Sequence, residues 1–117
     1  MKKFNNKIDF IFEKKLYSLK NKTKIFFKIM LNLTRFHFSN CKSYKKILDG
    51  LNIEFNNIKN LNDLPYLPIR LFKDNELISV KQKNIIRVLR SSGTTGSTTS
   101  KIFLDKINSQ HQIKTLN

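Results

Sequence analysis

Glycine is rare in this chain, and the positions of its three glycines constrain the fold more than any other feature. The chain has 117 residues, and the glycines are Gly50, Gly93 and Gly96. Glycine adopts positive φ angles without a steric penalty, so the tightest turns are expected near these residues. Apolar residues at helical spacing precede Gly50, and short β-branched segments follow it. We therefore expect a helical part at about residues 5–50 and a loop-and-strand part at about residues 51–117.

Three helices are predicted in the helical part. In residues 5–19, apolar side chains recur on one helical face. Thr23 is expected to cap the second helix, whose side chains are apolar nearly all round, which predicts burial against a partner. The third helix is expected from about Cys41 to Asp49, with Gly50 as its left-handed stop.

The loop-and-strand part is expected to hold short elements. Residues 51–64 are rich in Asn and predict a loop with a short turn of helix. Pro65 and Pro68 each disfavour helix in the preceding residue, and a short helix is predicted from Pro68 through Phe72. Strands are predicted at residues 76–80, 85–89 and 101–105, followed by a helix that begins at about residue 107 and is unfinished at Asn117. This order favours the α/β class.

The net charge of +15 suggests an anionic partner such as nucleic acid. Two observations weaken that interpretation. Nineteen Lys, fourteen Asn and fourteen Ile stand beside no Ala, which is the residue choice of A+T-rich codons. The basic residues are also scattered singly and in pairs, without one dense block. A small nucleic-acid-binding module is kept as an alternative and disfavoured.

The remaining composition favours a small intracellular domain. No apolar run approaches the roughly 20 residues of a membrane-spanning helix. The basic N-terminus runs into polar residues and lacks the apolar core of a secretory leader. A single cysteine excludes an internal disulfide and a structural zinc site. We expect a cytoplasmic protein with no membrane span.

Cys41 and His37 are candidate reactive residues that each have a simpler interpretation. Cys41 as an acyl-accepting nucleophile would require a positive, partly open site, whereas as a structural residue it is a small apolar filler. His37 lies between Phe36 and Phe38, and no carboxylate at helical spacing orients it. Helix packing explains these residues better than catalysis or base stacking, and no catalytic residue is assigned.

The segment from Ser91 to Ser100 contains eight Ser or Thr residues and two glycines. By composition it resembles a flexible linker. However, it lies between two predicted strands and contains Gly93 and Gly96, three residues apart. Glycines there let successive N–H groups point inward and form a concave site for an anion, most often phosphate. Lys101 adds a positive charge at the far end, so a phosphate-binding loop is favoured over a linker.

The spacing of the two glycines excludes the Walker and dinucleotide-binding patterns. The run SSGTTG instead resembles the phosphate loop of adenylate-forming enzymes. In order along the chain, FxFxxCxxYxxIL from Phe36 to Leu48, DLPYLPIRLFKDNELISV, RSSGTTG and SKIFLD resemble the LuxE-like acyl-protein synthetases. These ligases activate fatty acids in bacterial luciferase systems. Phenylacetate–CoA ligases share the loop, so an acid–thiol ligase of that kind is an alternative.

The resemblance implies an N-terminal piece of an adenylate-forming domain over residues 1–117. It also implies a two-step reaction, in which a carboxylic or fatty acid is activated by ATP and Mg²⁺ as an acyl-adenylate and then passed to a protein thiol. The amides of residues 93–97 would cradle the β- and γ-phosphates, and Lys101 would screen their charge. The implied nucleotide-binding residues are Ser92, Gly93, Thr94, Thr95, Gly96, Ser97 and Lys101; no metal ligand is assigned.

The same resemblance places the adenine pocket, the Mg²⁺ ligand, the acyl tunnel and the acyl-carrying cysteine after this segment. The isolated chain is therefore expected to be inactive alone. Its expected partners are the missing C-terminal part and an acyl-accepting or reductase protein. A non-catalytic docking subunit remains an alternative.

Overall fold

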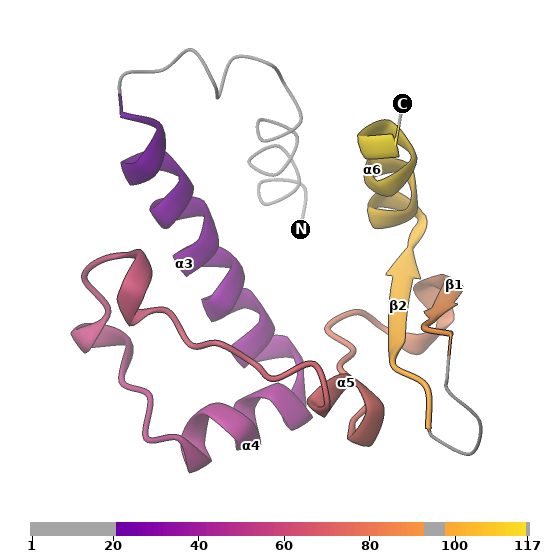
Figure 1. The fold of residues 1–117 in the computed structure, drawn as a ribbon, viewed down its shortest axis with the longest axis horizontal. Coiled ribbons are helices and arrows are strands. Elements are labelled where there is room, and N and C mark those ends of the chain that lie inside the picture. The colour runs from indigo at the N-terminus through magenta and orange to yellow at the C-terminus, as the bar shows by residue number, and fades with distance from the viewer. Residues whose placement is uncertain (1–20, 93–97, 117) are drawn as a thin grey trace.

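Helices lie before and after a two-stranded sheet along this chain. The structure is a computed structural model that describes residues 21–92 and 98–116. Its longer helices are α3 (Lys22–Asn40), α4 (Lys42–Gly50) and α6 (Lys106–Leu116), and α5 (Leu71–Asp74) is a single turn (Figure 1). The strands are β1 (Ile85–Arg90) and β2 (Lys101–Asp105). Short 3₁₀ turns lie at Phe55–Asn57, Leu61–Asp63 and Gln82–Asn84.

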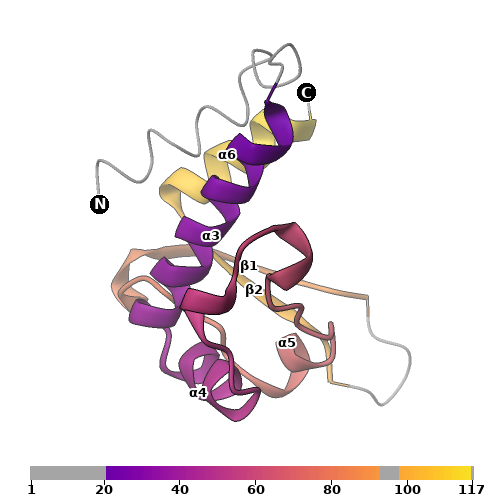
Figure 2. The same cartoon turned by 90° about the vertical axis from the view of Figure 1, so that its left-hand side faces the viewer.

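This architecture confirms a mixture of helix and sheet. The strands pair with each other in an antiparallel manner. Helix α6 packs against both strands and α5 packs against β2, while α3 packs against α4 (Figure 2). The strands predicted at residues 85–89 and 101–105 and the final predicted helix are confirmed. The helix predicted at residues 5–19 lies outside the described residues.

The predicted second helix is confirmed as α3, but two details of the prediction were wrong. The N-cap is Asn21 and not Thr23, because the Ile25 N–H already donates to the Asn21 carbonyl at 3.1 Å. Thr23 thus lies inside the first turn. The helix is also less buried than expected: Ile29 and Thr34 are buried, whereas Phe26 keeps 37% of its surface exposed. Helix α3 therefore packs mainly through one side.

The end of α4 corrects the role predicted for Gly50. The positive φ is at Asn52, with φ 53°, and Gly50 is the last helical residue. The Asn52 N–H donates to the Asp49 carbonyl at 3.1 Å, and the Ile53 N–H donates to the Leu48 carbonyl at 3.1 Å. This pair of bonds is the Schellman arrangement, with Asn52 in the left-handed position. Asn tolerates that conformation better than most other non-glycine residues, so Gly50 stays helical and Asn52 takes the left-handed position.

Residues 51–84 lead from α4 to the sheet. The Asp63 carboxylate accepts hydrogen bonds from the N–H groups of Lys59 and Asn60, at 2.9 and 3.0 Å, which fixes the turn before Pro65. The helix predicted from Pro68 begins at Leu71. The strand predicted at residues 76–80 was wrong, because no second strand pairs with this segment in the described part of the chain.

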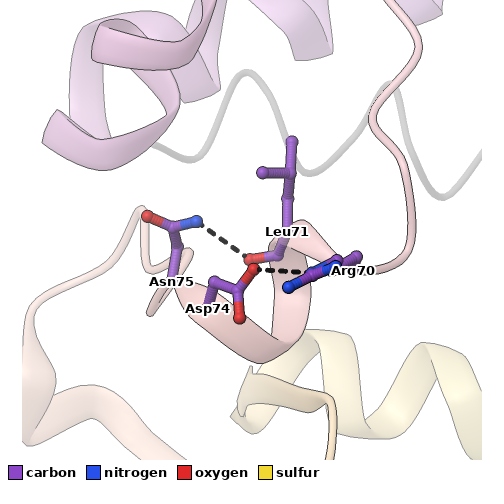
Figure 3. Close-up of polar contacts among 4 residues, drawn as sticks. All are labelled: Arg70, Leu71, Asp74 and Asn75. Carbon is purple, nitrogen blue, oxygen red and sulfur yellow. Dashed lines mark hydrogen bonds and ion pairs between the residues drawn. The ribbon is translucent and has the colours of Figure 1, made fainter.

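Two side-chain interactions lie at the ends of α5. Arg70 Nε lies 3.4 Å from the Asp74 carboxylate, and the Asn75 side-chain amide donates to the Leu71 carbonyl at 3.2 Å (Figure 3). Both ion-pair partners are largely exposed, so the pair contributes at most about 1 kcal/mol. The Leu71 carbonyl also accepts from the Asn75 backbone N–H at 3.0 Å, so the side-chain amide adds a second hydrogen bond to the same oxygen.

The core lies between α3, α4 and the segment that follows them. Its buried apolar residues are Ile29, Cys41, Leu48, Ile58 and Leu64, and Leu48 has no exposed surface. The ring of Phe38 packs edge-on against Phe55, with centroids 5.1 Å apart, which confirms that aromatic residues here serve packing.

One long-range hydrogen bond joins α3 to the segment before the sheet. His37 Nδ1 lies 2.6 Å from Ser79 Oγ, although the residues are 42 positions apart. Burial lowers the pKa of His37 below its ordinary value of 6.5. The folded protein therefore binds the proton of this imidazole less readily than the unfolded chain does.

Gly50→Ala should stabilise the protein. Gly50 is helical, and an added Cβ would meet nothing within 4 Å. Replacing glycine by alanine inside a helix is worth about 0.5–1 kcal/mol. Urea unfolding followed by circular dichroism would measure this gain. A loss of stability would show that Gly50, and not Asn52, needs the left-handed conformation.

The protein should lose stability as the pH falls through about 6.5, because unfolded His37 takes up a proton there and folded His37 does not. The slope contributed by this group is at most about 1.4 kcal/mol per pH unit. His37→Asn should remove that contribution, as measured by urea unfolding of both proteins above and below pH 6.5. Identical pH dependence in the two proteins would contradict the prediction.

Candidate phosphate-binding loop

The Ser- and Thr-rich segment connects two strands that pair with each other. In the β1–β2 ladder, Val88 faces Phe103, Leu89 faces Ile102 and Arg90 faces Lys101. The register shifts between Ile85 and Arg87, which is the signature of a β-bulge in β1. Such a bulge raises the local twist at the end of the hairpin away from the loop, and the pairing next to the loop is regular.

Two hydrogen bonds extend the pairing beyond the strands. The Ser91 N–H donates to the Ser100 carbonyl at 3.1 Å. The Ser100 N–H donates to Ser91 Oγ at 3.0 Å. Residues 92–99 are therefore closed at their base, as a loop inside one hairpin. This pairing contradicts the alternative that the segment links two separate modules.

The predicted nucleotide-binding residues fall into two groups. Ser92 follows the last hydrogen-bonded pair and is exposed, and Lys101 is the first residue of β2 and is half-buried. Gly93, Thr94, Thr95, Gly96 and Ser97 lie outside the described residues. The hairpin brings Ser92 and Lys101 to the same end of the sheet, and contact with phosphate stays a prediction.

Arg90 is a residue of this site that the sequence analysis did not assign. It faces Lys101 directly across the ladder. Side chains of facing residues lie on the same side of a sheet, with Cβ atoms about 4.5–5.5 Å apart, and like charges in such pairs are destabilising. In residues 21–92 and 98–116 the ion pair that forms is Arg70–Asp74, so no carboxylate of this part neutralises Arg90 or Lys101.

A sequence signal for Arg90 exists. The residue immediately precedes SSGTTG, and pairing Ser91 with Ser100 places it opposite Lys101. Arg90 would have been found by assuming that the two predicted strands form one hairpin. Two cations at the base of a loop make a favourable environment for a phosphate group.

The described residues offer no set of ligands that matches Mg²⁺. No cluster of three or more His, Cys, Asp or Glu side chains occurs among them. Asp105, at the end of β2, is engaged in capping α6, since its Oδ1 accepts hydrogen bonds from the Asn108 N–H and side-chain amide, both at 2.8 Å. No step involving Mg²⁺ is derived from this part of the chain.

Cys41 has a structural role. It is buried, with 4% of its surface exposed, and forms the N-cap of α4. Its sulfur accepts a hydrogen bond from the Tyr44 N–H at 3.4 Å. A nucleophilic thiol requires an accessible, positive environment, and burial at a helix cap does not offer access.

His37 was expected at the edge of the core, where the structure places it. Its hydrogen bond with Ser79 was not predicted, because 42 residues separate the two and no local pattern links them. A search of the described residues for a helix that could cross a membrane found none.

Comparisons with known proteins identify the family of this chain. A family described as "Acyl-protein synthetase, LuxE" matches residues 5–117. A protein of Photorhabdus luminescens named "Long-chain-fatty-acid–luciferin-component ligase" is 30% identical over 73 residues. That alignment covers 62% of this chain and 62% of the relative's length. No solved structure matches the chain. The family match spans nearly all of the sequence, so this chain belongs to the LuxE family of acyl-protein synthetases.

Proposed function

We propose that this chain supplies the ATP phosphate-binding loop for activation of a carboxylic acid. In the proposed reaction, the carboxylate of a fatty acid attacks the α-phosphorus of ATP and pyrophosphate leaves. A protein thiol then takes the acyl group from the acyl-adenylate as a thioester. The relative's name supports a long-chain fatty acid as the substrate.

The observation that carries this proposal is the facing pair Arg90 and Lys101 at the base of the SSGTTG loop. A like-charged pair costs stability unless an anion lies between or beside the two side chains. The β- and γ-phosphates of ATP are such an anion, and their negative charge increases as pyrophosphate departs. Cations fixed before the reaction stabilise that charge without reorganising.

The loop backbone would complete the cradle. In this proposal the N–H groups of residues 93–97 and the hydroxyls of Thr94 and Thr95 donate to phosphate oxygens, and Ser92 stands at the entrance. These groups stabilise the leaving group and do not activate the carboxylate. ATP and Mg²⁺ are the proposed cofactors. An acyl-accepting or reductase protein is the proposed partner.

The cation pair can be tested on this chain with inorganic pyrophosphate. Arg90→Gln and Lys101→Gln should each weaken pyrophosphate binding by about fivefold, since one charge pair at 4 Å in water is worth about 1 kcal/mol. Isothermal titration calorimetry at fixed ionic strength would measure this. Lys73→Gln on α5 removes the same charge elsewhere and is the matched control. Equal weakening of pyrophosphate binding by all three variants would contradict a specific site, because it would show only the general attraction of an anion to a basic protein.

The loop glycine can be tested in a full-length family enzyme that carries residues 36–117 of this chain. Gly93→Val should reduce acid-dependent ATP–pyrophosphate exchange by roughly 100- to 1,000-fold, because a side chain there obstructs phosphate and removes charge-stabilising donors. Cys41→Ala should leave the exchange rate near normal and lower stability only. The isolated 117-residue chain is the negative control and should show no exchange. Loss of exchange in Cys41→Ala with normal exchange in Gly93→Val would refute the assigned roles.

A further inference from the structure

A cavity of about 420 Å³ lies between α3, α4 and the segment that precedes the sheet. This volume falls within the usual range of small-ligand sites, roughly 300–1,000 Å³. Of the described residues of the hairpin, including Ser92 and Lys101, none lines it. Most of its wall is apolar, including Met30, Leu33, Leu67, Phe72 and Leu77. The cavity is therefore separate from the proposed ATP site and suits a hydrocarbon body.

The polar part of the wall is small and uncharged. His37 and Ser79 both line the cavity, with Nδ1 and Oγ 2.6 Å apart. Thr34, Cys41 and Tyr44 are the other residues with polar side-chain atoms that come from the two helices. Among residues 21–92 and 98–116, no Lys, Arg, Asp or Glu lines the cavity, although charged residues are 26% of the chain.

This lining restricts the chemistry of a ligand. A carboxylate or phosphate in the cavity would lie in apolar surroundings without a cation to pair with it, which is costly. A purely apolar ligand would leave the His37–Ser79 pair covered and without water. A hydrocarbon chain with one uncharged hydrogen-bonding group avoids both costs.

We propose that this cavity binds an aliphatic chain that ends in a hydroxyl group, with the hydroxyl hydrogen-bonded to the His37–Ser79 pair. A hydroxyl is suited to either arrangement of the pair. When the Ser79 hydroxyl donates to His37 Nδ1, the serine oxygen can accept a hydrogen bond from the ligand's hydroxyl. When Nδ1–H donates to Ser79, the serine proton is available for the ligand's oxygen.

Burial supports this arrangement. It lowers the pKa of His37, so the imidazole is neutral at neutral pH and adds no charge to the wall. Burial also raises the pKa of Tyr44, partly opposed by a hydrogen bond with Thr34, so its hydroxyl is likewise neutral. His37 and Tyr44 thus add no charge to the wall at neutral pH.

Cys41 provides a reporter inside the cavity. It is the only cysteine of the chain, it lines the cavity and it is buried. Because Cys41 is buried, it reacts when the protein opens locally, and a ligand bound to the closed form slows that reaction. Octanol at ten times its Kd should therefore slow the reaction of Cys41 with methyl methanethiosulfonate by about tenfold, as followed by mass spectrometry. Octanoate at pH 8, which is charged, should protect at least about tenfold less well at equal concentration. Absence of protection by octanol, or equal protection by octanoate, would overturn the proposal.

The polar contact is tested with variants of Ser79. Ser79→Ala should weaken octanol binding by about fivefold, whereas Ser79→Thr should keep it, because a net hydrogen bond contributes about that factor. Ser39→Ala, on the exposed side of α3 and outside the cavity lining, is the matched control. Unchanged octanol binding in a folded Ser79→Ala protein would overturn the proposed contact. If Ser79→Ala does not fold by circular dichroism, the comparison of octanol with octanoate on the unmodified chain decides.

Discussion

The antiparallel pairing of β1 with β2 is the constraint on which the site depends. A run of Ser, Thr and Gly has no side chains that could fold it into a fixed shape, and closing such a loop costs conformational entropy. The strands on each side supply the compensating interactions through their ladder and through the packing of α6 on both of them. The Ser91–Ser100 bonds then carry the pairing to the first residue of the SSGTTG motif. Without the ladder, the same composition would behave as a linker.

The ladder also brings together two positively charged side chains, although their repulsion lowers the stability of the protein. Arg90 and Lys101 face each other, and Arg87 lies three residues before Arg90 on β1. A strand end optimised for stability alone would place a carboxylate opposite a cation. Local rules of this kind are most often broken where a ligand supplies the missing interaction. The pair is therefore stronger support for an anion site than the net charge, which is distributed over the whole chain.

Sequence reasoning succeeded where the signal was local. The β-branched segments at residues 85–89 and 101–105 form strands, and the apolar face before Gly50 forms α4. It failed where the local structure depends on contacts with residues elsewhere in the chain. Residues 76–80 have strand composition but no strand beside them, since strand propensity is realised only in a paired setting. The left-handed residue predicted at Gly50 is instead Asn52. Two residues that tolerate positive φ lie near the helix end, and composition alone does not choose between them.

The same limit applies to the sites. SSGTTG is a contiguous motif, and it was identified without knowledge of the fold. Arg90 required the register of the hairpin, and the His37–Ser79 pair required a contact across 42 residues. The two sites also differ in electrostatics. Within the part of the chain that the structure describes, the loop base carries two cations without a paired carboxylate, whereas no charged side chain lines the cavity between α3 and α4. Two cations favour an anion as a ligand of the loop base, whereas apolar surroundings disfavour an anion in the cavity and favour an uncharged chain. The two proposed sites therefore call for ligands of opposite character, which burial and charge distinguish without any reaction.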